Sequence, residues 1–511
     1  MSKEFELIEA TVAGVHAAYA AGNLTARQLT QRYLDRIEAL DKSGPALNSI
    51  VAVNPMALAE ADRLDVMRKG GSAMGPLHGI PVIIKDQADV AGMATTLGSV
   101  LFKNHFPDRD CVVVEKLKAA GAIILAKATL GELGGGDTHG SLFGSTKNPY
   151  DLERTPGGSS GGPAASVAAN LGMLAVGQEG LASIRRPAGW NCLAGMRPTA
   201  GLVSRTGVYE GWPGIAGSLG PLTRTVTDLA LLLDAMVGYD PDDPVTASGV
   251  GHVPHSYTQS LDKDGLKGKR IGILRESMGL FAEPDSDDYR EIERVLDRSI
   301  EEMKKAGAQI VDPIVIPDLK ELLAKRAGSF FGAEETFKVY MHRNKNPIYK
   351  TRDEALHSPD FQKIVRSANL RWTKVPDPAM HYDFLKAREK LMFSYLKVMA
   401  DNNLDAIAHK AVEHSPTLIR DGIAPPWVEQ KGAPHINTYL VFVPTIVVPA
   451  GFTAQNLPAG LCFLGRPYDD ANLIKYAYAY EQATRYRRAP AIVKEPSGTG
   501  DRKVAVGNRR S

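Results

Sequence analysis

A short run of glycine and serine, PGGSSGG at 156–162, is the first place where residue types suggest chemistry. Such a run can be a linker, a loop that binds phosphate, or a turn that presents a nucleophilic serine. A linker would join two independent folds, but a predicted helix and strand follow at once, at 163–176. A Walker-type phosphate loop ends in lysine and then serine or threonine, and this run has no lysine. The run is therefore predicted to be a turn inside a packed unit.

A nucleophile elbow is the third interpretation. Residues 157–161 match G-x-S-x-G with Ser159 as the attacking serine. That motif needs a strand directly before it, and NPYDLERTP, with two prolines and several charges, is a poor strand. It also needs an acid and a late histidine, for which Asp405 and His435 are available. The elbow stays an alternative at this point.

A second segment with residues that could take part in catalysis ends in a lysine. HGIPVIIKD, 78–86, is a β-branched run that ends in Lys85 and Asp86, which predicts a buried strand with its charges at the tip. Lys85 is either an ordinary strand-end charge or a base whose pKa, ordinarily about 10.4, is lowered by burial. A carboxylate nearby would favour the charged lysine. Because adjacent side chains on a strand point to opposite faces, we expect Asp86 to point away from Lys85.

Several segments together resemble the amidase signature family of serine hydrolases. The central ones are GGSSGG, SIRRPA and GMRPTAGLVS. LHGIPVIIKD is similar to the family's lysine-bearing strand, and GSTKNPYDLERTPGGSSGG to the segment before its serines. GSLGPLTRTVTDLALLLDAM and PAGLCFLGRPYDDANLIKYAYAYEQATRYR also look like family segments. The resemblance covers roughly residues 5–490 and is weakest between 320 and 430.

The resemblance implies a Ser–cisSer–Lys catalytic unit that uses no histidine. The nucleophile is then Ser183, which precedes the IR stretch and lies 24 residues after Ser159. Ser159, after a cis peptide bond, is the bridging serine, and Lys85 is the base. A serine hydroxyl is a weak nucleophile and needs a base, and lysine serves only when neutral. The expected mechanism is an acyl-enzyme at Ser183, with Ser159 relaying protons to and from Lys85.

The resemblance also implies an oxyanion hole made of backbone N–H groups. Its members are Gly180, Leu181, Ala182 and Ser183. The family usually reads TDTGGS or DxGGS here, whereas this chain reads QEGLAS at 178–183. Backbone donors survive the change if the local conformation accepts a Cβ atom, and the larger side chains must narrow or redirect the pocket beside the nucleophile.

A second pocket wall is expected upstream of the serines. Counting back from Ser159, four residues align with the family's loop beside the scissile group, and they are the predicted substrate-binding residues: Leu133, Gly134, Gly135 and Gly136. Three glycines there mean a roomy site or a mobile loop. A plain loop of small residues is the alternative.

Alternating strands and helices around these segments predict an α/β fold. The clearest predicted helices are a capped one after Thr25 and those at 111–120, 163–170 and 285–307, and the clearest strands are those at 78–86, 122–126, 171–176, 270–275, 308–316 and 438–452. We expect a single large domain over 1–495 with a central mixed, mostly parallel twisted sheet flanked by helices. Its signature core spans about 75–230, a variable substrate-covering region spans about 320–430, and a mobile polar tail spans 496–511.

Composition narrows the class of protein. The net charge of +2 offers no electrostatic case for nucleic acid or an anionic membrane. The three cysteines, Cys111, Cys192 and Cys462, form no CxxC pair and are expected to be small core residues. His252 and His255 lie in a predicted loop, and no HExxH motif or carboxylate cluster accompanies them. The N-terminus lacks the plan of a signal peptide, which favours a cytoplasmic protein. No metal is expected in the absence of a metal-binding motif, and the resemblance implies a hydrolase without a cofactor.

The resemblance thus implies an amidase that cleaves a carbon–nitrogen bond in a linear amide, with anilides, carbamates and esters also open. The expected substrate is a small, uncharged, apolar or aromatic molecule, on the basis of six side chains: Leu181, Phe330, Phe331, Tyr340, Trp372 and Tyr382. Two alternatives stand beside it. One is the glutaminase subunit of a tRNA-dependent amidotransferase, and the other is a non-catalytic scaffold of the same fold. The oligomeric state is open, with a homodimer among the options.

Overall fold

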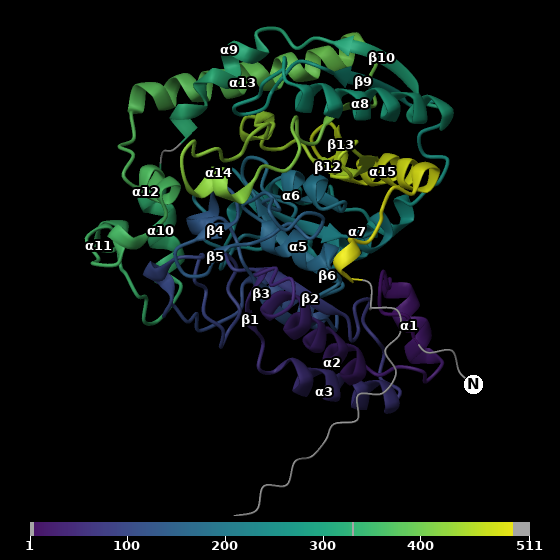
Figure 1. Ribbon diagram of the computed structural model, residues 1–511, viewed down its shortest axis with the longest axis vertical. Coiled ribbons are helices and arrows are strands. Elements are labelled where there is room, and N and C mark those ends of the chain that lie inside the picture. The colour runs from purple at the N-terminus through teal and green to yellow at the C-terminus, as the bar shows by residue number, and fades with distance from the viewer. Residues whose placement is uncertain (1–4, 330–331, 494–511) are drawn as a thin grey trace, which may run out of the picture.

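This computed structural model describes residues 5–329 and 332–493. The predicted tail at 496–511, and Phe330 and Phe331, lie outside the described residues. The fold is built on an 11-stranded sheet in the order β1-β3-β2-β6-β8-β7-β12-β13-β11-β9-β10, flanked by helices (Figure 1). The strands are β1 (Ile50–Val53), β2 (Pro81–Lys85), β3 (Ile123–Ala128), β6 (Leu174–Glu179), β7 (Ala194–Arg197), β8 (Ser218–Thr223), β9 (Arg270–Leu274), β10 (Gln309–Ile314), β11 (Ala406–Lys410), β12 (Thr445–Phe452) and β13 (Pro458–Leu464).

The sheet is mixed, as the sequence predicts, but the expectation that it is mostly parallel is wrong. Parallel pairs occur at its two ends, in β3-β2-β6 and in β11-β9-β10. Every pair from β6 through to β11 is antiparallel, and β1 is antiparallel at the edge. The turn at 453–457 between β12 and β13 is too short for a crossover, so that pair must be antiparallel.

The predicted helices are also present. Thr25 and Gln28 form the predicted capping box at the start of α2 (Ala26–Arg36). The other predicted helices are α4 (Val112–Ala119), α5 (Gly161–Ala168) and α8 (Asp287–Lys305). The apolar run at 438–452 forms the buried strand β12 at its C-terminal end. Local sequence pattern therefore identifies most of the elements that frame the site.

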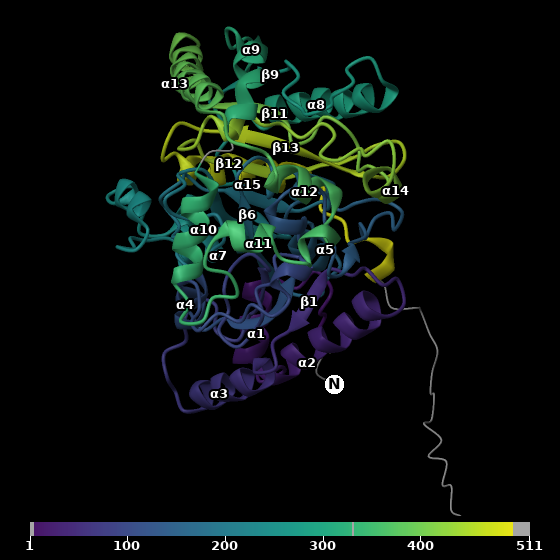
Figure 2. The same cartoon turned by 90° about the vertical axis from the view of Figure 1, so that its left-hand side faces the viewer.

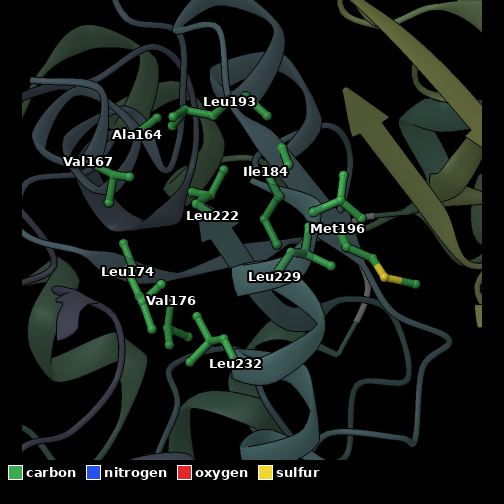
Figure 3. Packing of buried hydrophobic residues seen from close by; sticks show 14 of the residues in the cluster. Ala164, Val167, Leu174, Val176, Ile184, Leu193, Met196, Leu222, Leu229 and Leu232 are labelled. Atoms are coloured by element: carbon green, nitrogen blue, oxygen red, sulfur yellow. The ribbon is translucent and has the colours of Figure 1, made fainter. Parts of the chain in front are cut away.

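The core beneath the serine segment is formed by β6, α5 and α7 (Val226–Met236). Buried side chains from these elements belong to one cluster that includes Val167, Leu174 and Leu232 (Figure 3). Ile184, directly after Ser183, is fully buried in the same cluster. Burying such a side chain stabilises the fold by roughly 1.5–3 kcal/mol, so the chain on either side of Ser183 is held in place.

The residues between 320 and 430 pack onto this core in two places (Figures 1 and 2). Helix α10 (Ala333–His342) and helix α12 (Arg366–Trp372) share an apolar cluster with Phe102 and Leu133 of the N-terminal half. The long helix α13 (Pro378–Asp401) packs with residues of β9 and β11 at the other end of the sheet. This region therefore connects both ends of the sheet around one space, which is the cavity described below.

Candidate active site

Lys85, at the C-terminal end of β2, lies in a fully buried setting. Its Nζ donates a hydrogen bond to Ser159 Oγ at 2.7 Å and another to the carbonyl oxygen of Gln178 at 3.2 Å. Burial lowers the pKa of Lys85 from 10.5 to about 7, and the charges of Glu210 and Glu179 oppose that shift. A lysine in this state is substantially neutral near neutral pH.

Asp86 takes no part in this environment. Its carboxylate forms a buried ion pair with Lys127 at 2.8 Å and also accepts a hydrogen bond from the Thr96 N–H at 3.1 Å. The prediction that Asp86 points away from Lys85 is therefore confirmed. The strand alternation that separates the two side chains keeps the ion pair from holding the lysine in its charged form.

Ser159 follows a cis peptide bond from Gly158 and is fully buried. The next residue, Ser160, shapes the turn: its hydroxyl donates to the Gln178 carbonyl at 3.1 Å, and its N–H donates to the carbonyl oxygen of Ser183 at 3.1 Å. In the part of the chain that the structure describes, no strand leads directly into this turn, and α5 begins at Gly161. The geometry of a nucleophile elbow is therefore missing here.

Ser183 lies beside the turn and lines the large cavity. Its main chain is bonded to Ser160, but its hydroxyl makes no hydrogen bond within residues 5–329 and 332–493. The structure thus joins Lys85 and Ser159 directly and brings Ser183 to the same turn, without a hydrogen bond between the two serine hydroxyls.

The backbone N–H groups of residues 180–183 donate no hydrogen bond to any other residue that the structure describes. Gly180 borders open space, and both it and Leu181 line the cavity. Ala182 is buried. Free donors at the edge of a cavity are what an oxyanion requires, so Leu181 and Ala182 leave that option intact.

An ion pair that the sequence did not reveal supports this segment. Glu179 and Arg185 pair at 2.6 Å with both side chains buried. The same carboxylate accepts the N–H groups of Ile184 at 2.8 Å and Arg185 at 2.9 Å. Glu179 therefore ties the two ends of the 180–183 segment together. The only signal for it in the sequence QEGLASIRR is one acidic residue before, and two basic residues after, an otherwise small and apolar stretch.

A second buried arginine joins the two predicted loops. Arg186 forms an ion pair with Asp137 and donates to the carbonyl oxygens of Gly136 at 3.1 Å and Gly158 at 2.7 Å. The glycine loop and the serine turn are thus fixed to each other. Sequence reasoning missed this contact because the partners lie about fifty residues apart.

The cavity beside Ser183 has a volume of about 510 Å³. All four predicted substrate-binding residues line it: Leu133, Gly134, Gly135 and Gly136. Leu133, Gly134 and Gly136 have positive φ angles of 53°, 79° and 81°. A glycine accepts such angles at little cost, whereas Leu133 is held in them by its apolar packing.

Only some of the residues that suggested an apolar or aromatic substrate line the cavity. Leu181 and Trp372 line the cavity. Tyr340 is buried elsewhere and donates to Asp89 at 2.8 Å, and Tyr382 is exposed outside the cavity lining. Phe330 and Phe331 lie outside the described residues. Tyr340 and Tyr382 are therefore removed from the predicted set.

Other residues weighed from the sequence lie apart from the serines. Asp405 forms an ion pair with Lys269 at 3.1 Å. His435 is buried, with its Nε2 3.4 Å from the carbonyl oxygen of Leu323. His252 stacks on Tyr468 with ring centroids 3.9 Å apart. All three cysteines are buried, as expected, at Cys111, Cys192 and Cys462.

None of the helices in residues 5–329 and 332–493 combines the length and apolar character needed to cross a membrane. Within the same ranges, no three side chains of His, Cys, Asp or Glu come together as a set of metal ligands.

The chain is similar to known amidases and related proteins in both sequence and structure. A family model described as Amidase matches residues 28–474. The chain is 32% identical to "Probable amidase" of Arabidopsis thaliana, over 96% of this chain and 93% of that protein. It is also 32% identical to a glutamyl-tRNA(Gln) amidotransferase subunit of Moorella thermoacetica, over 92% and 96% of the two chains. The solved structure of native peptide amidase from Stenotrophomonas maltophilia is similar with a TM-score of 0.83 and 32% identity, over 95% and 99% of the two chains.

Proposed function

The chain belongs to the amidase (amidase signature) family, and we propose that it hydrolyses a carbon–nitrogen amide bond through an acyl-enzyme at Ser183. The observation that carries the proposal is the 2.7 Å hydrogen bond between Lys85 Nζ and Ser159 Oγ in a fully buried setting. Removal of water from around Lys85 makes it a base at neutral pH, and Ser159 is the one hydroxyl in its reach among the described residues.

The proposed reaction begins with proton transfer. Neutral Lys85 takes the proton of Ser159, Ser159 takes the proton of Ser183, and Ser183 Oγ attacks the amide carbonyl carbon. Because the two serine hydroxyls are not hydrogen-bonded to each other here, they must approach when substrate binds. Catalytic hydrogen bonds commonly tighten in this way.

Negative charge then develops on the carbonyl oxygen. The N–H groups of residues 180–183 stabilise it, and each such donor contributes roughly 3 kcal/mol. As the carbon–nitrogen bond breaks, the proton held by Lys85 returns through Ser159 to the leaving nitrogen. Water next attacks the acyl group by the reverse path, which releases the acid and restores Ser183.

Mass spectrometry of the intact protein tests the proposal. A panel of aliphatic amides, anilides, carbamates and esters is incubated with the protein, and any acyl adduct is located by peptide mapping. We expect the adduct on Ser183 and its loss in Ser183→Ala. Ser166→Ala is the matched control, because that buried serine lies in α5 and donates only to the Pro163 carbonyl at 2.9 Å. An adduct on Ser159 would instead make Ser159 the nucleophile, and neither adduct nor turnover would leave a non-catalytic protein of the same fold.

One observation favours a second candidate, the glutaminase-type component of an amidotransferase: several relatives at 32–34% identity over more than nine-tenths of this chain are named as amidotransferase subunits. Leu181 and Ala182 in the 180–183 segment distinguish this chain from the family's usual glycines. The two functions separate in the isolated protein. We expect turnover of several small amides by the chain alone, whereas a chain that acts only on glutamine and only with a captured partner protein would support the second candidate.

A further inference from the structure

The wall of the cavity that comes from residues 326–388 is rich in positive charge. Five cationic side chains line it: Arg326, Arg352, Arg371, Lys374 and Arg388. Among the described lining residues, Glu210 is the one carboxylate. A cleft lined mainly by one sign of charge concentrates its field on whatever binds there.

Helix α13 presents one face to this space. His381, Phe384, Leu385 and Arg388 all line the cavity, and their spacing of three, four and seven residues places them on one side of a helix. Phe384 is buried and Arg388 is half-buried. Arg388 therefore reaches the cavity past an apolar surface, as a long basic side chain can.

Three of the arginines lack a carboxylate partner. Across residues 5–329 and 332–493, no ion pair involves Arg352, Arg371 or Arg388. Arg352 donates to the Trp372 carbonyl at 2.5 Å, and Arg371 donates to the Glu132 carbonyl at 2.6 Å. These bonds orient the two guanidinium groups but bring no negative charge to them. The carboxylates that act on them at longer range are Glu210, on both, and Glu429, on Arg371. We name the three residues the arginine wall.

Glu210 does not neutralise the arginine wall. The charges of Arg371, Lys85 and Arg352 all act on Glu210, so one carboxylate is shared among three cations, one of which is the proposed base. Arg388 is not among them. Half-buried cations without counter-charges are costly to maintain unless a ligand supplies the charge.

We propose that the substrate carries a carboxylate away from the scissile amide, and that Arg388, supported by Arg352 and Arg371, binds it. This inference rests on the proposed hydrolytic function and deepens it by naming a substrate class, amides with an anionic substituent. It replaces the expectation of an uncharged substrate, while Phe384, Leu385 and Trp372 still offer apolar contact to the chain that links the carboxylate to the amide.

The test uses matched pairs of substrates. In each pair, one anilide carries a terminal methyl group on its acyl chain and the other carries a carboxylate at that position. A second set places the carboxylate on the amine side, so that the two sets show which half of the substrate bears the charge. In wild-type protein we expect kcat/KM for the carboxylate-bearing member of one set to exceed that of the neutral member by at least about tenfold.

Variants on α13 locate the effect. Arg388→Met should abolish the preference by lowering kcat/KM for the charged substrate about tenfold or more, with the neutral substrate within about twofold. Arg388→Lys should keep part of the preference. Lys386→Met is the matched control, because it removes one positive charge from the same helix at an exposed ion pair with Asp383, 2.9 Å, outside the cavity lining.

Calorimetry with the Ser183→Ala variant separates binding from turnover. Turnover without any charge preference in either set would overturn the carboxylate site and leave hydrolysis standing. Preferential binding of the charged members without turnover in the wild type would support the carboxylate site and overturn the proposed hydrolysis. Equal losses on charged and neutral substrates in Arg388→Met would also overturn the site, since they would show a structural role for Arg388 and no recognition of charge.

Discussion

The serine–lysine site and the arginine wall border the same cavity but differ in burial and in how their polar groups are paired. Lys85, Ser159 and Glu179 are buried, and each is hydrogen-bonded to partners that are themselves buried. The arginine wall is half-exposed: Arg352 and Arg371 donate to backbone carbonyls and share Glu210, and Arg388 lines the cavity. The polar groups of the buried site already have their partners within the protein, whereas among the described residues the arginine wall has no ion pair that a ligand would have to displace.

The difference in burial matches the different requirements of catalysis and of substrate recognition. A lysine becomes a base only if water is kept away, so the chemistry needs a dry and rigid setting. Recognition of a substrate needs charges that remain available until it binds. The two requirements are met by segments that lie far apart in the sequence, with the signature core supplying the first and residues 352–388 the second.

The largest expected effect is the loss of activity when the buried lysine is replaced. Lys85→Met removes the base while keeping an apolar side chain of similar length in the strand. We expect kcat/KM at neutral pH to fall by roughly a hundredfold to ten-thousandfold, because general acid–base catalysis contributes about that factor. Steady-state kinetics on any amide that turns over measures it. Lys118→Met, at the partly exposed ion pair with Asp110, is the control and should leave kcat/KM near wild type. A comparable loss in both variants would remove the special role of Lys85.

The next effect is on stability. Glu179→Gln leaves Arg185 fully buried without its counter-charge, which should cost roughly 3–5 kcal/mol in the free energy of unfolding. Asp287→Asn is the matched control, since its ion pair with Arg290 is exposed and screened by water, and its loss should leave stability close to wild type. Chemical denaturation compares the two. Similar losses would mean that the pair at Glu179 is no more important than a surface pair.

The same contrast explains what the sequence could and could not predict. The strand at 78–86, the helix after Ser160 and the links among Lys85, Ser159 and the 180–183 segment follow from local pattern and from resemblance. The Glu179–Arg185 pair lies within one segment, yet nothing local says that the two side chains meet. Arg371 and Arg388 reach the cavity from about two hundred residues beyond Ser183. Their role depends on how α12 and α13 pack, and helix pattern alone does not give that.

The lowered pKa of Lys85 also determines how activity should depend on pH. Burial places the pKa of Lys85 at about 7, and the reaction needs the neutral form. kcat/KM should therefore rise with pH and level off above about 7, with a tenfold loss for each unit below it. A profile that stays flat down to about pH 5 would show that Lys85 is not the titrating base.

That shift in pKa also has a consequence for folding. Because the pKa of Lys85 falls from 10.5 in the unfolded chain to about 7 in the folded one, the unfolded chain binds more protons between these values. Stability thus decreases as the pH falls from about 10.5 to 7 on account of this group. Lys85→Met removes the penalty, so its melting temperature should exceed that of the wild type by roughly 2 °C or more at pH 7, and by less near pH 10. An equal gain at both pH values would assign the effect to packing.

The smallest expected effect is on the arginine wall. Gly135 has an ordinary extended conformation, with φ −140°, so alanine suits its backbone. An added methyl group would lie 2.5 Å from Cζ and 2.7 Å from Nη1 of Arg371, which must then shift. Since the guanidinium is the far end of a flexible side chain, the fold tolerates the change but Arg371 loses its position.

We therefore expect Gly135→Ala to raise KM for a carboxylate-bearing amide roughly threefold, with kcat and the melting temperature close to wild type, because one partly exposed charged contact contributes about 0.5–1 kcal/mol. Gly70→Ala, at the end of α3 (Ala57–Lys69) and in ordinary contact with the Val66 carbonyl at 3.4 Å, is the control for adding a methyl group away from the cavity. A fall in kcat with unchanged KM would mean that the glycine loop acts on the serine–lysine site, through Arg186 and Gly158. The serine–lysine site and the arginine wall would then not be independent of each other.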